Sequence, residues 1–210
     1  SPAAALTLIL ANSTSDPAAI GAVTVARLRD DKRWAFSLTF DDGYVETFTN
    51  ATRYLGRYSY TGGIPMVGRF LDRGQIGVYT YLSDAQMREL YAAGWAIGNH
   101  TYSHQYVSYF ASATAALNDI IAARTRIGQG MAPLAPGFRS TAFTAPYVDM
   151  AYLPIVRDNA ATLGIYLFQG SGNEIRQVDS VAYGPDGFLA IGRNGIRHID
   201  PDFDTVHSLV

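Results

Sequence analysis

The sequence predicts an α/β fold in which a parallel sheet is covered by helices. From residue 34 onward, short segments with the alternating apolar pattern of a strand are followed by longer segments with the apolar period of a helix. Repeated strand–helix units of this kind build a parallel sheet with the helices outside. The 210 residues, of which 48% are hydrophobic, are enough for one domain with a substantial core.

The first strand–helix unit starts with a predicted strand over 34–40, along which apolar residues alternate. The helix that follows has one apolar face, made by residues spaced four, three and four apart: Tyr44, Phe48, Ala51 and Leu55. Gly56 is the expected end of this helix. Residues 59–67 are predicted as a second strand, which Gly62 and Gly63 interrupt.

The next helix has a clear N-terminal signal. Ser83 is placed to cap it, and Gln86, three residues later, completes a capping box. Gly94 is the expected end of this helix, and the apolar run 95–98 is predicted as a short buried strand. A longer amphipathic helix is predicted around residues 117–127.

The C-terminal third continues the same alternation. Residues 138–144 and 165–168 are predicted as strands. Between them we expect a helix from about Pro154 to Leu163, because proline is tolerated in the first turn of a helix. Residues 204–210 have the pattern of the start of a helix and not of an apolar strand.

Composition narrows the function classes. With 16 basic and 18 acidic residues the formal net charge is −2, and no basic stripe stands out, which argues against nucleic acid as the main partner. Cysteine is absent, which excludes disulfides, thiolate metal sites and cysteine nucleophiles. No apolar run approaches the ~20 residues needed to span a bilayer. Because the sequence starts at Ser1 and is rich in tyrosine and small residues, we expect an extracellular or cell-envelope location.

Three segments with chemically active side chains follow directly after predicted strands. They are the Asp-Asp-Gly at 41–43, the histidine-containing segment 99–104, and the Ala-Pro-Tyr at 145–147. In barrel-like α/β folds, active sites lie at the carboxyl ends of the parallel strands. The shared location of the three segments therefore predicts one composite site.

The spacing of two histidines indicates a metal site. His100 and His104 are four residues apart, and residues at that spacing share one face of a helix. With one carboxylate they would hold a divalent metal by three ligands and leave positions open, as catalytic sites do. A second carboxylate would then be a base for a metal-bound water. Taken alone, Asp-Asp-Gly is also typical of a solvated turn, and two histidines at this spacing can also be an inert pair on the surface. The chain has only four histidines, and the presence of two of them in one pentapeptide favours metal ligation.

Two pentapeptides carry a resemblance to a known family. Thr-Phe-Asp-Asp-Gly at 39–43 and His-Thr-Tyr-Ser-His at 100–104 resemble the first two signature motifs of the polysaccharide deacetylases, carbohydrate esterase family four. The similarity covers roughly residues 34–170. It implies a distorted (β/α) barrel with fewer than eight units, here incomplete at the C-terminus. The chain would then consist of an N-terminal extension, 1–33, and a deacetylase-like catalytic domain, 34–210.

The resemblance also implies roles for individual residues. Asp42, His100 and His104 would bind one divalent metal, with zinc expected. Asp41 would be the general base that activates a metal-bound water, and the backbone N–H of Tyr147 would stabilise the oxyanion. The implied reaction is hydrolysis of N-acetyl (amide) or O-acetyl groups on an acetylated polysaccharide or oligosaccharide.

Two departures from the family pattern bear on catalysis. The third motif of the best-known members begins with an arginine that pairs with the base, whereas Thr144 stands in that position here. Arg139, earlier in the same strand, is either an ordinary solvated or paired arginine or a replacement for the missing one. The last family motif supplies a histidine as general acid. After His104 this chain contains only His198 and His207. His207 lies in a segment that resembles the start of a helix, so His198 is the only internal candidate for the acid, and the alternative is that His198 is an exposed loop histidine.

The apparent lack of the last motif leaves three interpretations. The favoured one is a chain whose remainder, a companion fragment or another subunit, covers the open edge of the sheet. The others are an enzyme that uses a different acid, and a carbohydrate-binding or structural module that has lost activity on the same scaffold. A different metallohydrolase, such as a phosphoesterase, is less favoured because such enzymes often use two metals and more carboxylates.

Aromatic residues near the motifs are candidates for stacking on sugar rings, although such residues are also common as core or rim filler. The candidates are Tyr81, Tyr102, Tyr106, Tyr109 and Tyr147.

Overall fold

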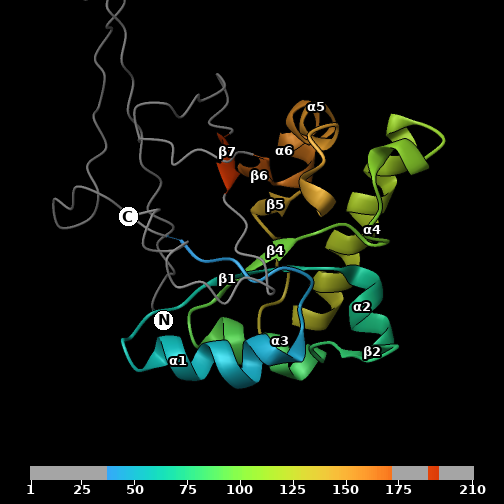
Figure 1. Ribbon diagram of the computed structural model, residues 1–210. Coiled ribbons are helices and arrows are strands. Elements are labelled where there is room, and N and C mark those ends of the chain that lie inside the picture. The colour runs from blue at the N-terminus through green and yellow to red at the C-terminus, as the bar shows by residue number, and fades with distance from the viewer. Residues whose placement is uncertain (1–36, 172–188, 194–210) are drawn as a thin grey trace, which may run out of the picture.

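One parallel sheet forms the centre of the fold (Figure 1). The structure is a computed structural model, and it describes residues 37–171 and 189–193. Neighbouring strands pair in parallel in the order β1-β4-β5-β6-β7. The strands are β1 (Gly63–Met66), β4 (Ala96–Asn99), β5 (Ala142–Thr144), β6 (Leu167–Ser171) and β7 (Leu189–Arg193). The predicted α/β class with a parallel sheet is therefore confirmed.

The chain segment before β1 runs parallel to it but pairs only through isolated bridges. Thr39 pairs with Gly63 and Asp42 with Met66, and the Phe40 amide donates to the Gly63 carbonyl at 2.9 Å. Of the predicted strand 34–40, residues 37–40 therefore run alongside β1 but do not form a continuous strand. Residues 34–36 lie outside the described residues.

A turn follows this paired segment, in agreement with the Asp-Asp-Gly sequence, which is typical of turns. Asp42 and Gly43 both have left-handed backbone, with φ of 71° and 75°. Glycine suits the left-handed backbone at position 43, and a Cβ there would also lie 2.7 Å from the Met66 Cε, so that side chain would have to move. The left-handed pair ends the strand pairing and starts the first helix.

Helices connect the strands in sequence. They are α1 (Thr52–Gly56), preceded by the π-helical turn η3 (Thr47–Ala51), then α2 (Gly68–Arg73), α3 (Asp84–Ala92), α4 (Ala113–Met131), α5 (Tyr152–Asp158) and α6 (Ala160–Leu163). The prediction of a single helix from Pro154 to Leu163 is wrong in one respect. It is two short helices, since Asn159 leaves helical geometry at φ −118°.

Several elements have no counterpart in the sequence-based prediction. They are α2, the antiparallel pair β2 (Gln75–Ile76) and β3 (Tyr79–Thr80), the 3₁₀ turns η4 (Val107–Tyr109) and η5 (Pro146–Val148), and strand β7. The predicted helix start at 204–210 and the region 1–33 lie outside the described residues.

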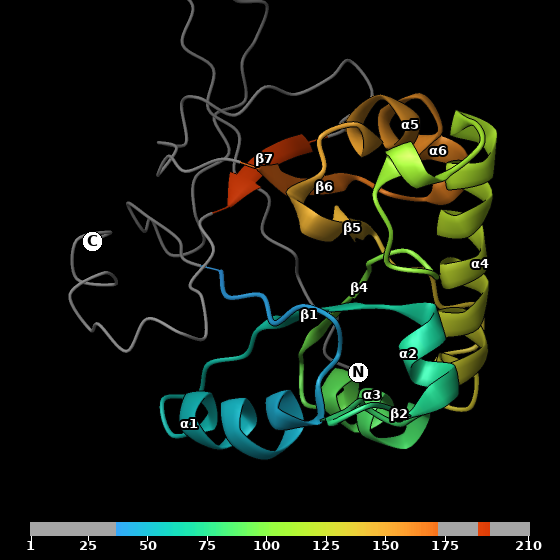
Figure 2. The ribbon, with the colours of Figure 1, turned by 45° about the vertical axis from the view of Figure 1, so that its right-hand side comes forward.

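Helix α4 connects the two ends of the described fold. Figure 2 shows it along one side of the molecule, with α2 and α3 at one end and α5 and α6 at the other. Ile120 of α4 packs into a core with Phe143 and Tyr152, and Ile127 packs into a second core around Met87. All five of these residues are buried, so one helix contributes to both cores.

The predicted capping box of α3 is confirmed. The Gln86 amide donates to Ser83 Oγ at 3.3 Å, and the Ser83 amide donates to Gln86 Oε1 at 2.9 Å. Two amides that would otherwise lack partners at the helix N-terminus are thereby satisfied.

Replacing Ser83 by alanine should destabilise the fold by about 1 kcal/mol, because the Gln86 amide loses its acceptor. Urea denaturation of Ser83→Ala and of the Ser83→Thr control measures the effect. Ser83→Thr keeps a hydroxyl acceptor and should retain most of the free energy of unfolding. Equal losses in the two variants would contradict this role of the cap.

Candidate metal centre

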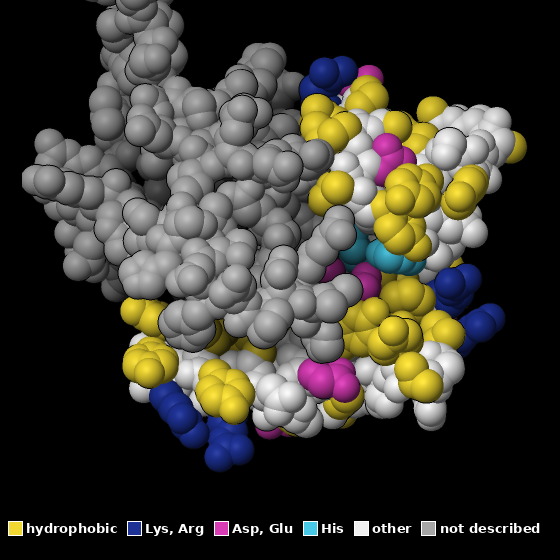
Figure 3. Space-filling model, in the orientation of Figure 1, with side chains coloured by type: hydrophobic (Ala, Val, Ile, Leu, Met, Phe, Trp, Pro, Cys, Tyr) yellow, Lys and Arg dark blue, Asp and Glu magenta, His cyan; other side chains and the backbone are white. Residues whose placement is uncertain are grey.

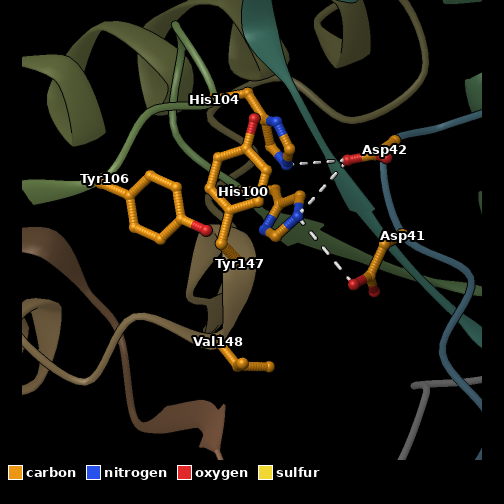
Figure 4. A pocket seen from close by; sticks show the side chains of 7 residues that line it. All are labelled: Asp41, Asp42, His100, His104, Tyr106, Tyr147 and Val148. Atoms are coloured by element: carbon orange, nitrogen blue, oxygen red, sulfur yellow. Dashed lines mark ion pairs between the residues drawn. The ribbon is translucent and has the colours of Figure 1, made fainter. Parts of the chain in front are cut away.

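Three potential metal ligands converge at the carboxyl edge of the sheet (Figure 4). Asp42 Oδ1 lies 3.4 Å from His100 Nε2 and 3.1 Å from His104 Nε2. The three ligand atoms all lie within 4.8 Å of one another. Asp42 lies at the end of a segment that pairs with β1, and His100 follows β4, which also pairs with β1, so the carboxyl ends of these parallel segments bring the two residues together.

The orientation of His100 is set by a buried hydrogen bond. Its Nδ1 lies 2.7 Å from the carbonyl oxygen of Thr144, at the end of β5. A carbonyl oxygen only accepts, so Nδ1 carries the proton and donates. In the neutral ring, Nε2 therefore presents a lone pair toward Asp42, which is the form a metal ligand requires.

His104 reaches the site from a loop and not from a helix. The segment 100–104 has no helical assignment, and Thr101 and His104 have left-handed backbone with φ of 65° and 55°. The His104 amide donates to Thr101 Oγ1 at 3.0 Å, which closes the turn. The rings of His100 and His104 are 4.9 Å apart between centroids. The expectation that the two histidines share a helical face is wrong, although their spacing still brings them together.

Helices α2 and α4 hold this loop from two sides. Asp119 of α4 accepts hydrogen bonds from the amides of Tyr102 and Ser103, both at 3.1 Å. The amide of Gly68, at the start of α2, donates to the Thr101 carbonyl at 3.1 Å. A Cβ on Gly68 would lie 2.5 Å from the Tyr102 ring, so only glycine permits this close approach.

Asn99 is a supporting residue that sequence reasoning did not identify. It is buried, its amide nitrogen donates to the Ile120 carbonyl at 3.0 Å, and its Oδ1 accepts from the Thr101 amide at 2.9 Å. One side chain thus fixes the loop to α4. The only signal in the sequence was a polar residue directly after an apolar strand.

The buried carboxylate of Asp42 makes this centre suitable for binding a cation. Asp42 Oδ1 is buried and has no hydrogen-bond partner among the described residues, while two imidazole nitrogens face it. Burial raises the pKa of Asp42, but positive charge and hydrogen-bond donors on the facing imidazoles of His100 and His104 lower it by more, so this pKa lies well below its usual value. A cation bound between neutral imidazoles would supply the same positive charge beside an ionised Asp42. An ionised oxygen and two nitrogen lone pairs facing one another are a donor set suited to a divalent metal.

Asp41 lies beside this centre and is more accessible than Asp42. Its Oδ2 is 3.9 Å from His100 Nε2, and its side chain is 29% exposed, against 18% for Asp42. Arg139 is exposed and lies next to Gly164, before β6, at the opposite end of the sheet. Arg139 is therefore an ordinary solvated arginine, and the interpretation that it replaces the missing family arginine is wrong.

The centre forms the floor of an open pocket of about 440 Å³. The residues that line the pocket are Asp41, Asp42, His100, His104, Tyr106, Tyr147 and Val148. Of the tyrosines predicted to contact sugar, Tyr106 and Tyr147 line the pocket, whereas Tyr81 is buried and Tyr102 donates to Asp72 at 2.7 Å. His198 and His207 lie outside the described residues.

Left-handed backbone is concentrated around this pocket. Six non-glycine residues of the described chain have positive φ, and five of them line or flank the pocket: Asp42, Thr101, His104, Tyr147 and Val148. The sixth is Ser59. Such conformations cost of order 1–3 kcal/mol each and tend to occur at functional sites.

The comparison with protein families gives one match. The family model described as polysaccharide deacetylase matches residues 29–167, more than half of the chain. A curated relative, YxkH of Bacillus subtilis (strain 168), whose own assignment as a polysaccharide deacetylase is provisional, is 34% identical over 67 residues. That alignment covers 32% of this chain and 22% of the relative, so the chain matches about a fifth of that protein's length.

Solved structures share the fold. A Streptococcus pyogenes deacetylase, PplD, in complex with acetate has a TM-score of 0.63 at 18% identity, over 82% of this chain and 69% of that one. IcaB from Ammonifex degensii has a TM-score of 0.62 at 19% identity, over 77% of this chain and 67% of that one.

Within the described residues, no helix has both the length and the apolar character required to cross a membrane.

Replacing Asn99 by alanine should leave the buried Thr101 amide without its acceptor and remove the side-chain hydrogen bond to the Ile120 carbonyl of α4. We expect a loss of about 2–4 kcal/mol of unfolding free energy and zinc affinity at least about tenfold weaker. Chemical denaturation and zinc titration measure the two effects. Asn50→Ala, at an exposed position of η3, is the matched control and should change neither. Wild-type zinc affinity in Asn99→Ala would contradict its role in placing the loop.

Proposed function

Because the chain belongs to the polysaccharide deacetylase family, we propose that it hydrolyses acetyl groups on a polysaccharide with the help of one divalent metal. The observation that carries the proposal is the convergence of Asp42, His100 and His104, with Asp41 beside them, in an open pocket. An extracellular or cell-envelope location, expected from the sequence, is part of this proposal.

Asp42, His100 and His104 would hold the metal. One carboxylate oxygen and two imidazole nitrogens are a set that zinc accepts, and three protein ligands leave room for substrate. When bound, such a cation lowers the pKa of water and polarises a carbonyl oxygen. The contribution of Thr144 is indirect, because its carbonyl keeps the proton of His100 on Nδ1 and leaves Nε2 available.

Asp41 would act as the general base. As water attacks the acetyl carbonyl carbon, Asp41 accepts the proton and a carbon–oxygen bond forms. The bond from this carbon to the sugar nitrogen, or to the sugar oxygen in an ester, then breaks and acetate leaves. The leaving amine requires one proton, which Asp41 transfers to it.

The backbone N–H of Tyr147 would stabilise the negative charge that develops on the acetyl oxygen. Tyr147 lines the pocket, and its backbone is left-handed (φ 54°, ψ 21°), as is that of Val148 beside it in η5. The conformational cost of such a residue is consistent with a functional constraint on the orientation of its amide.

Replacing Asp41 by asparagine should lower acetate release by about 10²–10⁴-fold, because the base is lost. Zinc affinity should stay within a few-fold, since the three ligands remain. Acetate assays on an N-acetylated glucosamine pentamer and zinc titration measure the two quantities. Asp158→Asn, an exposed carboxylate of α5, is the control. Full activity of Asp41→Asn would exclude Asp41 as the base.

Removal of the metal with a chelator should abolish acetate release, and added zinc should restore it. His104→Ala should weaken zinc binding and lose activity together, because it removes one of three ligands. If the zinc-loaded wild-type chain binds the acetylated pentamer and releases no acetate, the alternative function, a carbohydrate-binding module without turnover, is favoured.

A further inference from the structure

Aromatic rings form a continuous run across the candidate metal centre. The His104 ring lies 4.6 Å from the Tyr147 ring on one side and 5.7 Å from the Phe70 ring on the other, between centroids. His104 is therefore both a candidate metal ligand and the middle ring of this run, which has one arm on either side.

The first arm starts at Tyr147 and extends to η4. Tyr147 stacks on Tyr106 with 4.3 Å between centroids and 12° between the ring planes. Tyr106 in turn meets the edge of Tyr109 at 5.8 Å. All three rings are exposed, and Tyr109, at the end of the arm, is 71% exposed.

The second arm extends to the β2–β3 hairpin. Phe70 stacks on Tyr81 at 4.3 Å, Tyr81 on Tyr44 at 5.1 Å, and Tyr44 lies 5.6 Å from Tyr79. Phe70 and Tyr81 are buried and form the base of the arm, whereas Tyr79 at its end is 56% exposed. Figure 3 shows hydrophobic side chains on both sides of the histidines on one face of the molecule.

We propose that this aromatic run is a binding track for a polysaccharide chain, with sugar rings on both sides of the one whose acetyl group enters the pocket. Tyrosine offers a flat apolar face for the C–H groups of a sugar ring and a hydroxyl for its polar edge. Exposed aromatic surface that continues into a polar pocket is typical of a ligand site. The identity of the ligand rests on the proposed function.

The two-armed track has a consequence for specificity. A sugar chain that contacts both Tyr79 and Tyr109 presents an internal residue to the metal centre between them. The chain should therefore prefer acetyl groups inside a polymer to those on a monosaccharide, which is too short to contact either end of the track.

Alanine substitution at each end of the track tests this proposal. Tyr79→Ala and Tyr109→Ala, made in the Asp41→Asn background to prevent turnover, should each weaken calorimetric binding of an N-acetylated glucosamine pentamer about five- to tenfold. Binding of the N-acetylglucosamine monomer, followed by saturation-transfer NMR, should not change. Tyr109→Phe should bind like the parent, since it keeps the ring.

Tyr166→Ala is the matched control. Tyr166 is 52% exposed and directly precedes β6, at the end of the sheet opposite to the pocket. Thermal unfolding of each variant establishes that it is folded. The proposal is overturned if Tyr79→Ala and Tyr109→Ala bind the pentamer as Tyr166→Ala does, or if the parent does not bind the pentamer.

The same experiments separate this inference from the proposed function. Pentamer binding that depends on Tyr79 and Tyr109, without acetate release by the zinc-loaded wild type, would overturn the hydrolysis and support the track. Acetate release by the wild type, with pentamer affinities unchanged by both substitutions, would overturn the track and support the hydrolysis.

Discussion

The buried hydrogen bond from His100 to the carbonyl of Thr144 is the interaction on which the site depends most. It links the residue after β4 to the end of β5 and fixes which imidazole nitrogen faces Asp42. Both partners are buried, so any other ring orientation would leave a polar group unsatisfied. The acceptor belongs to the backbone. For this reason the bond is unaffected by the presence of threonine where the family has arginine.

The second requirement of the site is a loop held between two helices. Asp119 and the Ile120 carbonyl of α4 bind the histidine loop from one side, and the start of α2 binds it through Gly68. Because α4 also contributes Arg126, which pairs with Asp84 of α3 at 2.8 Å and with Asp72 of α2, the helices around the loop are tied together. The position of His104 is thus a property of the packed helices and not of the loop alone.

Much of this arrangement could be predicted from sequence, and the reasons differ between elements. The Ser83 capping box and the parallel strand–helix alternation are local signals, and the structure has both. The four-residue spacing of His100 and His104 predicted their convergence, but its cause lies in the left-handed backbone of a loop. No local pattern encodes the roles of Asn99 and Asp119, because their partners are 21 and 16–17 residues away. Short elements such as β2, β3 and β7 lack the length that makes a pattern recognisable.

The left-handed residues around the pocket affect which part of the described fold opens first on heating. Val148 is a β-branched residue in a conformation that suits glycine, and Tyr147 beside it shares that conformation. The strain of these residues is offset by packing in the rest of the fold, so within the described residues the rim of the pocket loses less stabilisation by opening than the buried cores do. Thermal inactivation would accordingly precede loss of the two cores of the described residues. Substitutions that relax the rim, such as glycine at 148, would raise heat tolerance while loosening the shape of the pocket.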